Sequence, residues 1–198
     1  MRWVVFDYGD VISKHTSGLP ALARLLGTPL AGFDAVYWAS RESYDNGRTD
    51  LDYWRAIGAA VGVDVDEELS GRLTELDVAG WLDVEPASAD LLTDLSEAGV
   101  PMALLSNAPT TFARTAEQQP WTKHFRHLLF SADLGFVKPD ARIWAALADR
   151  LDAEPDDLVF FDDRQVNIDG AVTAGLSGLL WRGADGARRE LRELGLLS

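Results

Sequence analysis

The sequence predicts an α/β fold in which a parallel sheet carries helices on both faces. From residue 86 onward, short apolar runs alternate with amphipathic helical stretches, which is the pattern of repeated β-α units. A first apolar run, Val4-Val5-Phe6, stands apart because a helical block at 14–80 follows it. We therefore expect a sheet that includes this first strand and a helical insertion directly after it.

Hydrophobic periodicity places the individual elements. The first strand is bounded by a turn and ends at Asp7. Gly27, Gly47 and Gly62 punctuate the helical block, and the expected helices there are 19–26, 33–44, 51–61 and 67–76. Beyond residue 86, helices at 87–98, 141–151, 167–174 and 188–196 are expected between strands at 102–105, 128–130, 158–161 and 179–181. We expect the last of these helices on the surface.

Composition limits the classes of function. A chain of 198 residues with 47% apolar content can bury one core and a modest insertion. It has no cysteine, which excludes disulfides and thiolate chemistry and fits a cytoplasmic protein. We expect no signal peptide and no membrane span, because Met1-Arg2-Trp3 leads straight into the first strand and no apolar run is long enough. The formal charge of −14 disfavours nucleic acid and anionic membranes as partners.

A carboxylate stands at the end of the first strand. In open α/β sheets ligands bind outside the carboxyl ends of the strands, so Asp7 is in the right place for chemistry. Alone, Asp7 would most simply be a strand-end aspartate that accepts turn hydrogen bonds. Three later segments supply the other groups that phosphoryl transfer needs.

The first two of these segments offer a hydroxyl and a cation. Ser106 and Asn107 follow the strand at 102–105, where a hydroxyl and backbone N–H groups can bind a phosphate oxygen. Lys138 precedes Pro139 just ahead of a helix, so its ammonium can point into the same site. Each segment taken singly is also explained by an ordinary turn or a solvated lysine.

The third segment is an acid pair, Asp162-Asp163, at the end of a buried apolar strand. Adjacent carboxylates there destabilise the fold unless a cation binds them. Hard oxygen ligands with no histidine or cysteine nearby indicate Mg²⁺. One of the acids can instead cap the following helix, a role that Asp162 keeps in part.

In this order the four segments resemble the haloacid dehalogenase superfamily of aspartate-nucleophile hydrolases, over nearly the whole chain. The resemblance implies a Rossmann-like core at 1–13 and 81–198, with an α-helical cap at 14–80 inserted after the first strand. The implied catalytic residues are Asp7, Ser106 and Lys138, with Asn107 also at the phosphate. The implied Mg²⁺ ligands are Asp7, the backbone carbonyl of Gly9, and Asp163, with Asp162 and Asn167 supporting them.

Within the superfamily the motif sequences are most similar to those of the bacterial α-D-glucose-1-phosphate phosphatase group. The likeness rests on Asp7-Tyr8-Gly9-Asp10-Val11, on the six residues at 138–143 and on Val159-Phe160-Phe161-Asp162-Asp163. Asp45-Asn46-Gly47-Arg48 also matches a cap turn of that group. The resemblance implies a sugar phosphate as substrate.

One position departs from the pattern of typical phosphatases in this superfamily. They carry a second aspartate two residues after the nucleophile, which protonates the leaving group, and this chain has Gly9 there. General acid–base help is worth about 10²–10⁴-fold, so its loss favours substrates with good leaving groups. Asp10 is a possible substitute for the missing acid.

The resulting hypothesis is a Mg²⁺-dependent phosphatase that hydrolyses a small phosphorylated metabolite through an aspartyl-phosphate. Two alternatives stay open: a haloacid dehalogenase of the L-2 type, and a non-catalytic regulator that binds a phosphorylated metabolite. Candidate substrate contacts in the cap are Tyr37, Trp38, Tyr44, Asp45 and Trp54, although aromatic residues at helical spacing often serve packing instead. The chain is expected to be a monomer or a homodimer.

Overall fold

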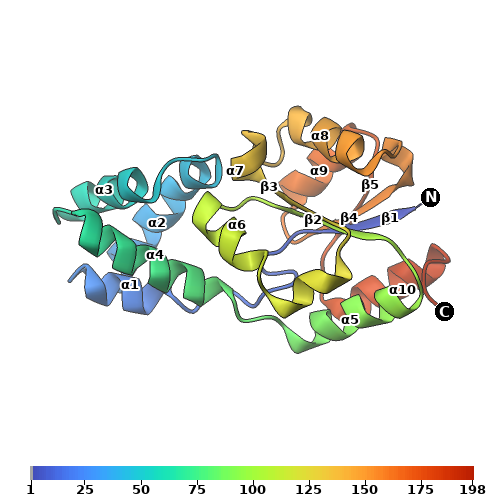
Figure 1. Cartoon of the computed structure of the whole chain (residues 1–198), viewed down its shortest axis with the longest axis horizontal. Helices are drawn as coiled ribbons and strands as arrows, with labels where there is room; N and C mark the ends of the chain where they lie inside the picture. The colour runs from blue at the N-terminus through green and yellow to red at the C-terminus, as the bar shows by residue number, and fades with distance from the viewer. Residues whose placement is uncertain (1) are drawn as a thin grey trace.

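Five short strands form one parallel sheet in a computed structural model that describes residues 2–198 (Figure 1). The strands are β1 (Trp3–Phe6), β2 (Met102–Ser106), β3 (His127–Phe130), β4 (Leu158–Asp162) and β5 (Ser177–Leu180). They lie in the order β3-β2-β1-β4-β5. All residues of β1, β2 and β4 are buried, as expected of a parallel sheet covered on both faces. The predicted α/β fold is confirmed.

The strand order reverses between β1 and β4. The chain adds β2 and β3 on one side of β1, and β4 and β5 on the other. A backbone hydrogen bond of 2.9 Å from the Asp7 N–H to the Phe161 carbonyl joins the carboxyl ends of β1 and β4. Ligands bind outside the strand ends at such a reversal, so Asp7 lies where a site is expected.

Helices cover both faces of the sheet (Figure 1). The helices on one face are α5 (Pro86–Glu97), α6 (Thr110–Ala116), the 3₁₀ helix η1 (Pro120–His124) and α10 (Ala184–Glu193). Those on the other face are α7 (Ser131–Leu134), α8 (Ala141–Leu151) and α9 (Gln165–Thr173), and the 3₁₀ helix η2 (Pro155–Asp157) leads into β4. Side chains alternate along β1, so Val4 and Phe6 belong to the first core and Val5 to the second.

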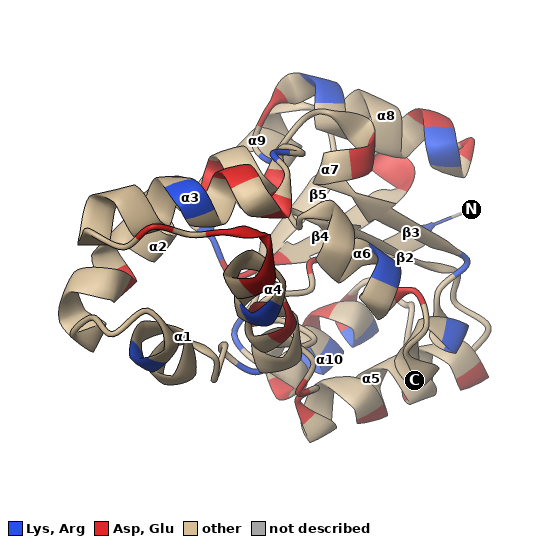
Figure 2. Cartoon of the chain, turned by 60° about the vertical axis from the view of Figure 1, so that its left-hand side comes forward, with Lys and Arg blue, Asp and Glu red and all other residues tan. Residues whose placement is uncertain are grey.

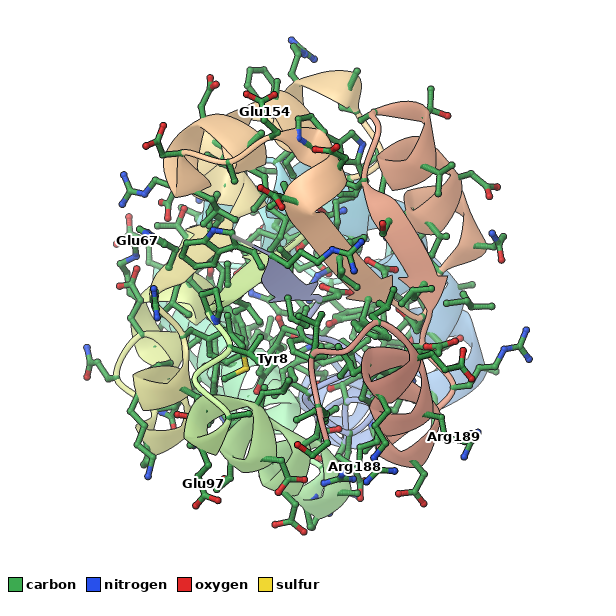
Figure 3. The ribbon with its side chains drawn as sticks, turned by 90° about the vertical axis from the view of Figure 1, so that its right-hand side faces the viewer. Tyr8, Glu67, Glu97, Glu154, Arg188 and Arg189 are labelled. Carbon is green, nitrogen blue, oxygen red and sulfur yellow. The ribbon has the colours of Figure 1, made fainter. Side chains whose placement is uncertain are left out.

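The residue after Asp7 points into the first of these cores. Tyr8 is 2% exposed, and its hydroxyl donates a hydrogen bond of 2.8 Å to the backbone carbonyl of Trp81. Figure 3 shows Tyr8 in the interior, whereas Glu97 and Arg189 lie at the periphery. Alternation along the chain thus leaves Asp7 on the opposite side, toward Lys138.

Four of the five helices between β1 and β2 lie together beside the sheet, at the left of Figure 1. They are α1 (Leu19–Leu25), α2 (Leu30–Asp45), α3 (Asp50–Val61) and α4 (Glu67–Trp81), here called the helical segment. They share their own apolar core, which includes Leu22, Phe33, Trp54, Ile57 and Leu73. The division into a core and a cap at 14–80 stays a prediction, and α4 itself extends to Trp81.

The helix α4 is longer than its apolar pattern predicts. Its last turns contain Asp77, which is buried, and Gly80, so apolar spacing does not extend to the end of the helix. A Cβ on Gly80 would lie 2.7 Å from the backbone nitrogen of Gly18, so only glycine permits this close approach between the two segments.

The C-terminal helix also differs from expectation. It begins at Ala184 instead of residue 188, and it buries Leu191 in the core on the first face of the sheet, so it is more than a surface helix. The short elements α6, α7, η1 and η2 were not predicted, because so few residues do not establish a period. Within residues 2–198, no helix has both the length and the apolar character that a bilayer span requires.

Candidate active site

A buried lysine between two carboxylates forms the centre of the site. The Lys138 ammonium lies 2.7 Å from Asp7 Oδ1 and 2.7 Å from Asp162 Oδ2, and it donates a hydrogen bond of 3.0 Å to the Leu105 carbonyl. Lys138 is 3% exposed and Asp162 is fully buried. Charges this far from water must be paired, and here one cation serves two anions.

Burial and charge act in opposite directions on these groups. Burial raises the pKa of Asp7, Lys138 opposes that rise, and the charge of Asp162 adds to it. Burial alone would lower the pKa of Lys138, but the two carboxylates hold this pKa above its ordinary value. Lys138 is therefore a stable cation beside Asp7 in the neutral pH range.

Hydrogen bonds occupy both oxygens of Asp162. Asn167 Nδ2 donates to Oδ1 and Oδ2 at 2.9 and 3.0 Å, and the Arg164 N–H donates to Oδ1 at 2.9 Å. The bond from Arg164 joins Asp162 to the residue that precedes α9, but α9 has no side-chain cap hydrogen bond, so the capping role considered above is not seen. Lys138 also donates to Oδ2, so the Asp162 carboxylate holds the side chains of Lys138 and Asn167 in place.

Together with Asp163, the two acids beside Lys138 make a group that fits a divalent cation. Asp163 lines the cavity, and one carboxylate oxygen each from Asp7, Asp162 and Asp163 lie within 4.8 Å of one another. Asn167 is 1% exposed, and its Oδ1 has no hydrogen-bond partner in the described chain. Hard oxygen donors beside an unsatisfied buried oxygen suit Mg²⁺. Asp7 and Asp163 would hold it, with the Gly9 carbonyl as the third predicted ligand.

The predicted phosphate-binding residues lie at the same edge of the sheet. Ser106 ends β2, is 3% exposed and lines the cavity. Asn107 exchanges two hydrogen bonds with the backbone of Lys138: the Lys138 N–H donates to Oδ1 at 2.8 Å, and Nδ2 donates to the Lys138 carbonyl at 3.1 Å. Asn107 therefore also fixes the loop that carries the lysine.

Trp81 lies beside Gly9, the position where the resemblance described above predicts a second aspartate. Gly9 does not have a positive φ angle, so its backbone conformation does not require glycine. A Cβ on Gly9 would contact the Trp81 ring at 3.4 Å, an ordinary van der Waals distance. A larger side chain at this position would have to pass beside that ring.

Asp10, the possible substitute acid, is engaged by a histidine. Its φ angle is +57°, in the left-handed region that aspartate tolerates better than most residues. Both of its carboxylate oxygens lie 3.1 Å from His15 Nδ1. Asp10 lines the cavity, and no pattern in the amino-acid sequence indicated its contact with His15.

The cavity has a volume of about 560 Å³. Of the five candidate substrate contacts in the helical segment, two line this cavity and three do not. Trp38 and Asp45 line it, and Trp38 is 38% exposed. Tyr37, Tyr44 and Trp54 are fully buried among the helices and do not line the cavity. For these three residues the packing explanation holds.

Tyr44 is corrected as a possible substrate contact. Its ring stacks on Tyr53 at 3.9 Å, and its hydroxyl donates a hydrogen bond of 2.7 Å to Asp50 Oδ1. Thr111 in α6 donates to the other oxygen of Asp50 at 2.7 Å. Tyr44 thus helps to join the helical segment to the sheet domain and does not reach the substrate space.

The structure adds a buried arginine that sequence reasoning missed. Arg41 lines the cavity, and its Nε donates to Asp45 Oδ1 at 2.9 Å. Its Nη1 lies 3.0 Å from Asp77 Oδ2 and also donates to the Tyr37 hydroxyl. That hydroxyl accepts a bond of 3.1 Å from Trp81 Nε1. The four-residue spacing of Arg41 and Asp45 on one helix was the available signal.

The fold and the motifs agree with a family-level match. A family model described as haloacid dehalogenase-like hydrolase matches residues 1–175. Among curated proteins, the phosphoglycolate phosphatase 1 of Pseudomonas aeruginosa is 27% identical over 187 residues, which are 88% of this chain and 67% of that protein. The bifunctional epoxide hydrolase 2 of Sus scrofa is 37% identical over 71 residues, which are 36% of this chain.

The chain spans only part of the first curated relatives. The matched stretch covers 13% of the Sus scrofa protein. It covers 44% of the flavin mononucleotide hydrolase 1 of Arabidopsis thaliana, which is 26% identical over 54% of this chain.

Solved structures show the same fold. The L-2-haloacid dehalogenase from Xanthobacter autotrophicus, with chloropropionic acid covalently bound, has a TM-score of 0.73 and 18% identity over 100% of this chain and 85% of its own. A haloacid dehalogenase family enzyme from Bacteroides thetaiotaomicron, in complex with magnesium and inorganic phosphate, has a TM-score of 0.68 and 17% identity over 91% and 93%. The match over residues 1–175 and the shared fold together show that this chain belongs to the haloacid dehalogenase-like hydrolase family.

Proposed function

We propose that the chain is a Mg²⁺-dependent phosphatase that hydrolyses a small phosphomonoester through an aspartyl-phosphate on Asp7. The observation that carries the proposal is the charge arrangement at the strand ends. Asp7, Asp162 and Asp163 offer oxygens within 4.8 Å of one another, beside the buried ammonium of Lys138. A metal and a lysine together offset the repulsion between an acidic protein and an anionic substrate.

In the first step, Asp7 Oδ2 attacks phosphorus while Lys138 holds Oδ1 at 2.7 Å. The bond between phosphorus and the ester oxygen breaks, and the electron pair leaves with that oxygen. The Lys138 ammonium and the Ser106 hydroxyl stabilise charge on the phosphoryl oxygens. Mg²⁺, when bound, would neutralise further negative charge on the phosphoryl group. In the second step, water attacks phosphorus and the bond between Asp7 Oδ2 and phosphorus breaks, which restores the Asp7 carboxylate. One proton of the water stays on the released phosphate, and the other passes through solvent to the oxygen of the departed leaving group.

The acid pair distinguishes this proposal from the two alternatives. A haloacid dehalogenase attacks carbon and needs no metal, so it has no use for Asp163 as a free carboxylate at the cavity. A regulator that only binds a phosphorylated metabolite does not need a nucleophile, whereas here the buried Lys138 holds the Asp7 carboxylate in place for attack. The structural likeness to dehalogenases is one of fold, since the identities are below 25%.

A sugar phosphate is the proposed substrate type. The motif likeness to the α-D-glucose-1-phosphate phosphatase group supports it. An anomeric oxygen also leaves more readily than a simple alkoxide, which suits a site without an acid at Gly9.

Magnesium dependence is the first test of this proposal. Excess EDTA should abolish phosphate release in a screen of sugar phosphates, acyl phosphates and nucleotides, and Mg²⁺ should restore it. Asp163→Asn should lower metal affinity, measured by calorimetry, together with activity. Asp169→Asn, an exposed change on α9, is the matched control and should alter neither. Full activity in EDTA would contradict the proposal.

Leaving-group dependence tests the consequence of Gly9. Without a positioned acid, the rate should fall steeply as the leaving-group pKa rises, so aryl and acyl phosphates should react much faster than alkyl phosphates. Gly9→Asp should flatten this dependence, because the Gly9 backbone accepts a side chain and a Cβ there meets the Trp81 ring at van der Waals distance. Gly9→Asn introduces a side chain of nearly the same shape as aspartate but without the acid, so the rate of this variant should still depend steeply on the leaving-group pKa.

A wild-type slope as shallow as that of Gly9→Asp would show that another group supplies the proton. Asp10→Asn in the same ester series would then identify Asp10 or exclude it.

A further inference from the structure

Part of the cavity lining comes from the helical segment. It consists of Trp38, Arg41, Glu42, Asp45 and Trp81, here called the helical wall. The groups proposed to bind phosphate lie instead at the strand ends. A phosphomonoester bound there would extend its leaving group into the rest of the cavity, so the chemistry of the helical wall indicates which leaving groups fit.

The only cation of the helical wall is already neutralised. The Arg41 guanidinium is bound by Asp45 at 2.9 Å and by Asp77 at 3.0 Å, and 11% of the side chain is exposed. Its guanidinium carbon also lies 5.4 Å from the ring centre of Tyr37 and 5.8 Å from that of Trp81. Two carboxylates on one guanidinium leave a net negative charge, so Arg41 cannot serve as the receptor for a substrate anion.

Two carboxylates of the helical wall can accept hydrogen bonds from a ligand. Asp45 is 7% exposed, and Arg41 is its one side-chain partner within residues 2–198, through Oδ1. Burial raises the pKa of Asp45 to about 6, with Arg41 opposing the rise, so the group is ionised above neutral pH. Glu42 lies exposed at the rim, and its carboxylate has no ion pair in the part of the chain that the structure describes.

The rest of the helical wall is aromatic. The Trp38 and Trp81 rings meet edge to face at 6.2 Å, and Trp38 is 38% exposed. Indole faces pack against the C–H faces of polyols and against cations. Figure 2 shows acidic positions predominating over basic ones along α2, α3 and α4. Arg164 also lines the cavity but is not part of the helical wall, since its backbone N–H donates to Asp162 at the end of β4.

We infer that the site selects phosphomonoesters whose leaving group presents hydroxyl or ammonium donors and carries no second negative charge, an inference that rests on the proposed phosphatase function. A donor on the leaving group gains a bond to Asp45 or Glu42. A carboxylate or second phosphate there meets two acceptors and no free donor, and like charges brought together in a desolvated site repel. Likeness to a phosphoglycolate phosphatase therefore does not extend to the carboxylate of its named substrate.

Three ligands with one two-carbon skeleton test this inference. They are phosphoglycolate, 2-hydroxyethyl phosphate and phosphoethanolamine, which end in a carboxylate, a hydroxyl and an ammonium. Their inhibition constants are measured against hydrolysis of an aryl phosphate with Mg²⁺ at pH 8. Phosphoglycolate should bind about tenfold more weakly than the other two, the size expected of one partly screened charge contact.

Variants assign the selectivity to the helical wall. Glu42→Gln and Asp45→Asn should each reduce the discrimination against phosphoglycolate severalfold. Glu75→Gln removes the same charge from an exposed position on α4 that does not line the cavity, and it should leave the ratio unchanged. If Asp45→Asn does not fold because Arg41 loses a partner, Glu42→Gln alone decides.

Two results would overturn the inference. One is that phosphoglycolate binds as tightly as 2-hydroxyethyl phosphate. Weaker binding of phosphoglycolate to Arg164→Gln would then identify Arg164 as the group that binds its carboxylate. The other is a ratio that neither Glu42→Gln nor Asp45→Asn changes. A protein that hydrolyses no phosphate ester would instead contradict the proposed function, and the same ratios, measured as calorimetric dissociation constants, would still decide the inference.

Discussion

Asp7→Asn should abolish phosphate release while leaving the protein folded. The amide is almost isosteric with the carboxylate but is not a nucleophile, so the aspartyl-phosphate cannot form. Loss of a catalytic nucleophile lowers kcat by about 10⁴-fold or more. The measurement is the steady-state rate with an aryl phosphate and Mg²⁺, together with the thermal unfolding midpoint.

The fold of this variant should survive because Lys138 keeps Asp162 as a partner at 2.7 Å. Asp94→Asn is the matched control: the same chemical change on α5, where Asp94 pairs with Arg188 at the surface. It should retain the full rate. If Asp7→Asn keeps more than about one tenth of the wild-type kcat, a difference of only 1.4 kcal/mol, Asp7 is not the nucleophile.

Lys138→Met should give the largest loss of stability. The change leaves Asp7 and Asp162 buried at the strand ends without their shared cation. Removing one partner of a buried ion pair costs about 3–5 kcal/mol in the free energy of unfolding, because the remaining charge is uncompensated. Urea denaturation at neutral pH measures this free energy.

A second change should recover part of that loss. Asp162→Asn in the Lys138→Met background removes one of the two unpaired charges, so the double variant should be more stable than Lys138→Met alone. Lys14→Met is the control, since Lys14 pairs with Asp83 on the surface and should have little effect. Equal stabilities of Lys138→Met and Lys14→Met would show that the buried pairing is not what holds the strand ends together.

Parallel topology explains why much of the site could be predicted. Carboxyl ends of parallel strands meet at one edge, so polar residues directly after apolar runs are brought together whatever their distance in the sequence. Asp7, Ser106 and Asp163 were predicted in this way, and the structure brings all three to one cavity. The supporting role of Asn107 was missed because a side-chain bond to the Lys138 backbone leaves no periodic signal.

The helical wall was harder to predict, because its contacts join residues far apart in the chain. Arg41 pairs with Asp77 across two helices, and Trp81 reaches Gly9 from the end of α4. Helical periodicity predicts that a face is buried but not what it is buried against. Trp38 and Trp54 look alike in the sequence, yet one lines the cavity and the other is fully buried.

The most direct test of the central claim is a search for the phosphorylated intermediate. The protein is mixed with an aryl phosphate and Mg²⁺, quenched in acid at times within one turnover, and digested for mass spectrometry. The account predicts one added phosphoryl group on the peptide that contains Asp7, which appears and decays during turnover and is absent with EDTA and in Asp7→Asn. A phosphoryl group on another residue, or complete turnover with no adduct at any time, would contradict it.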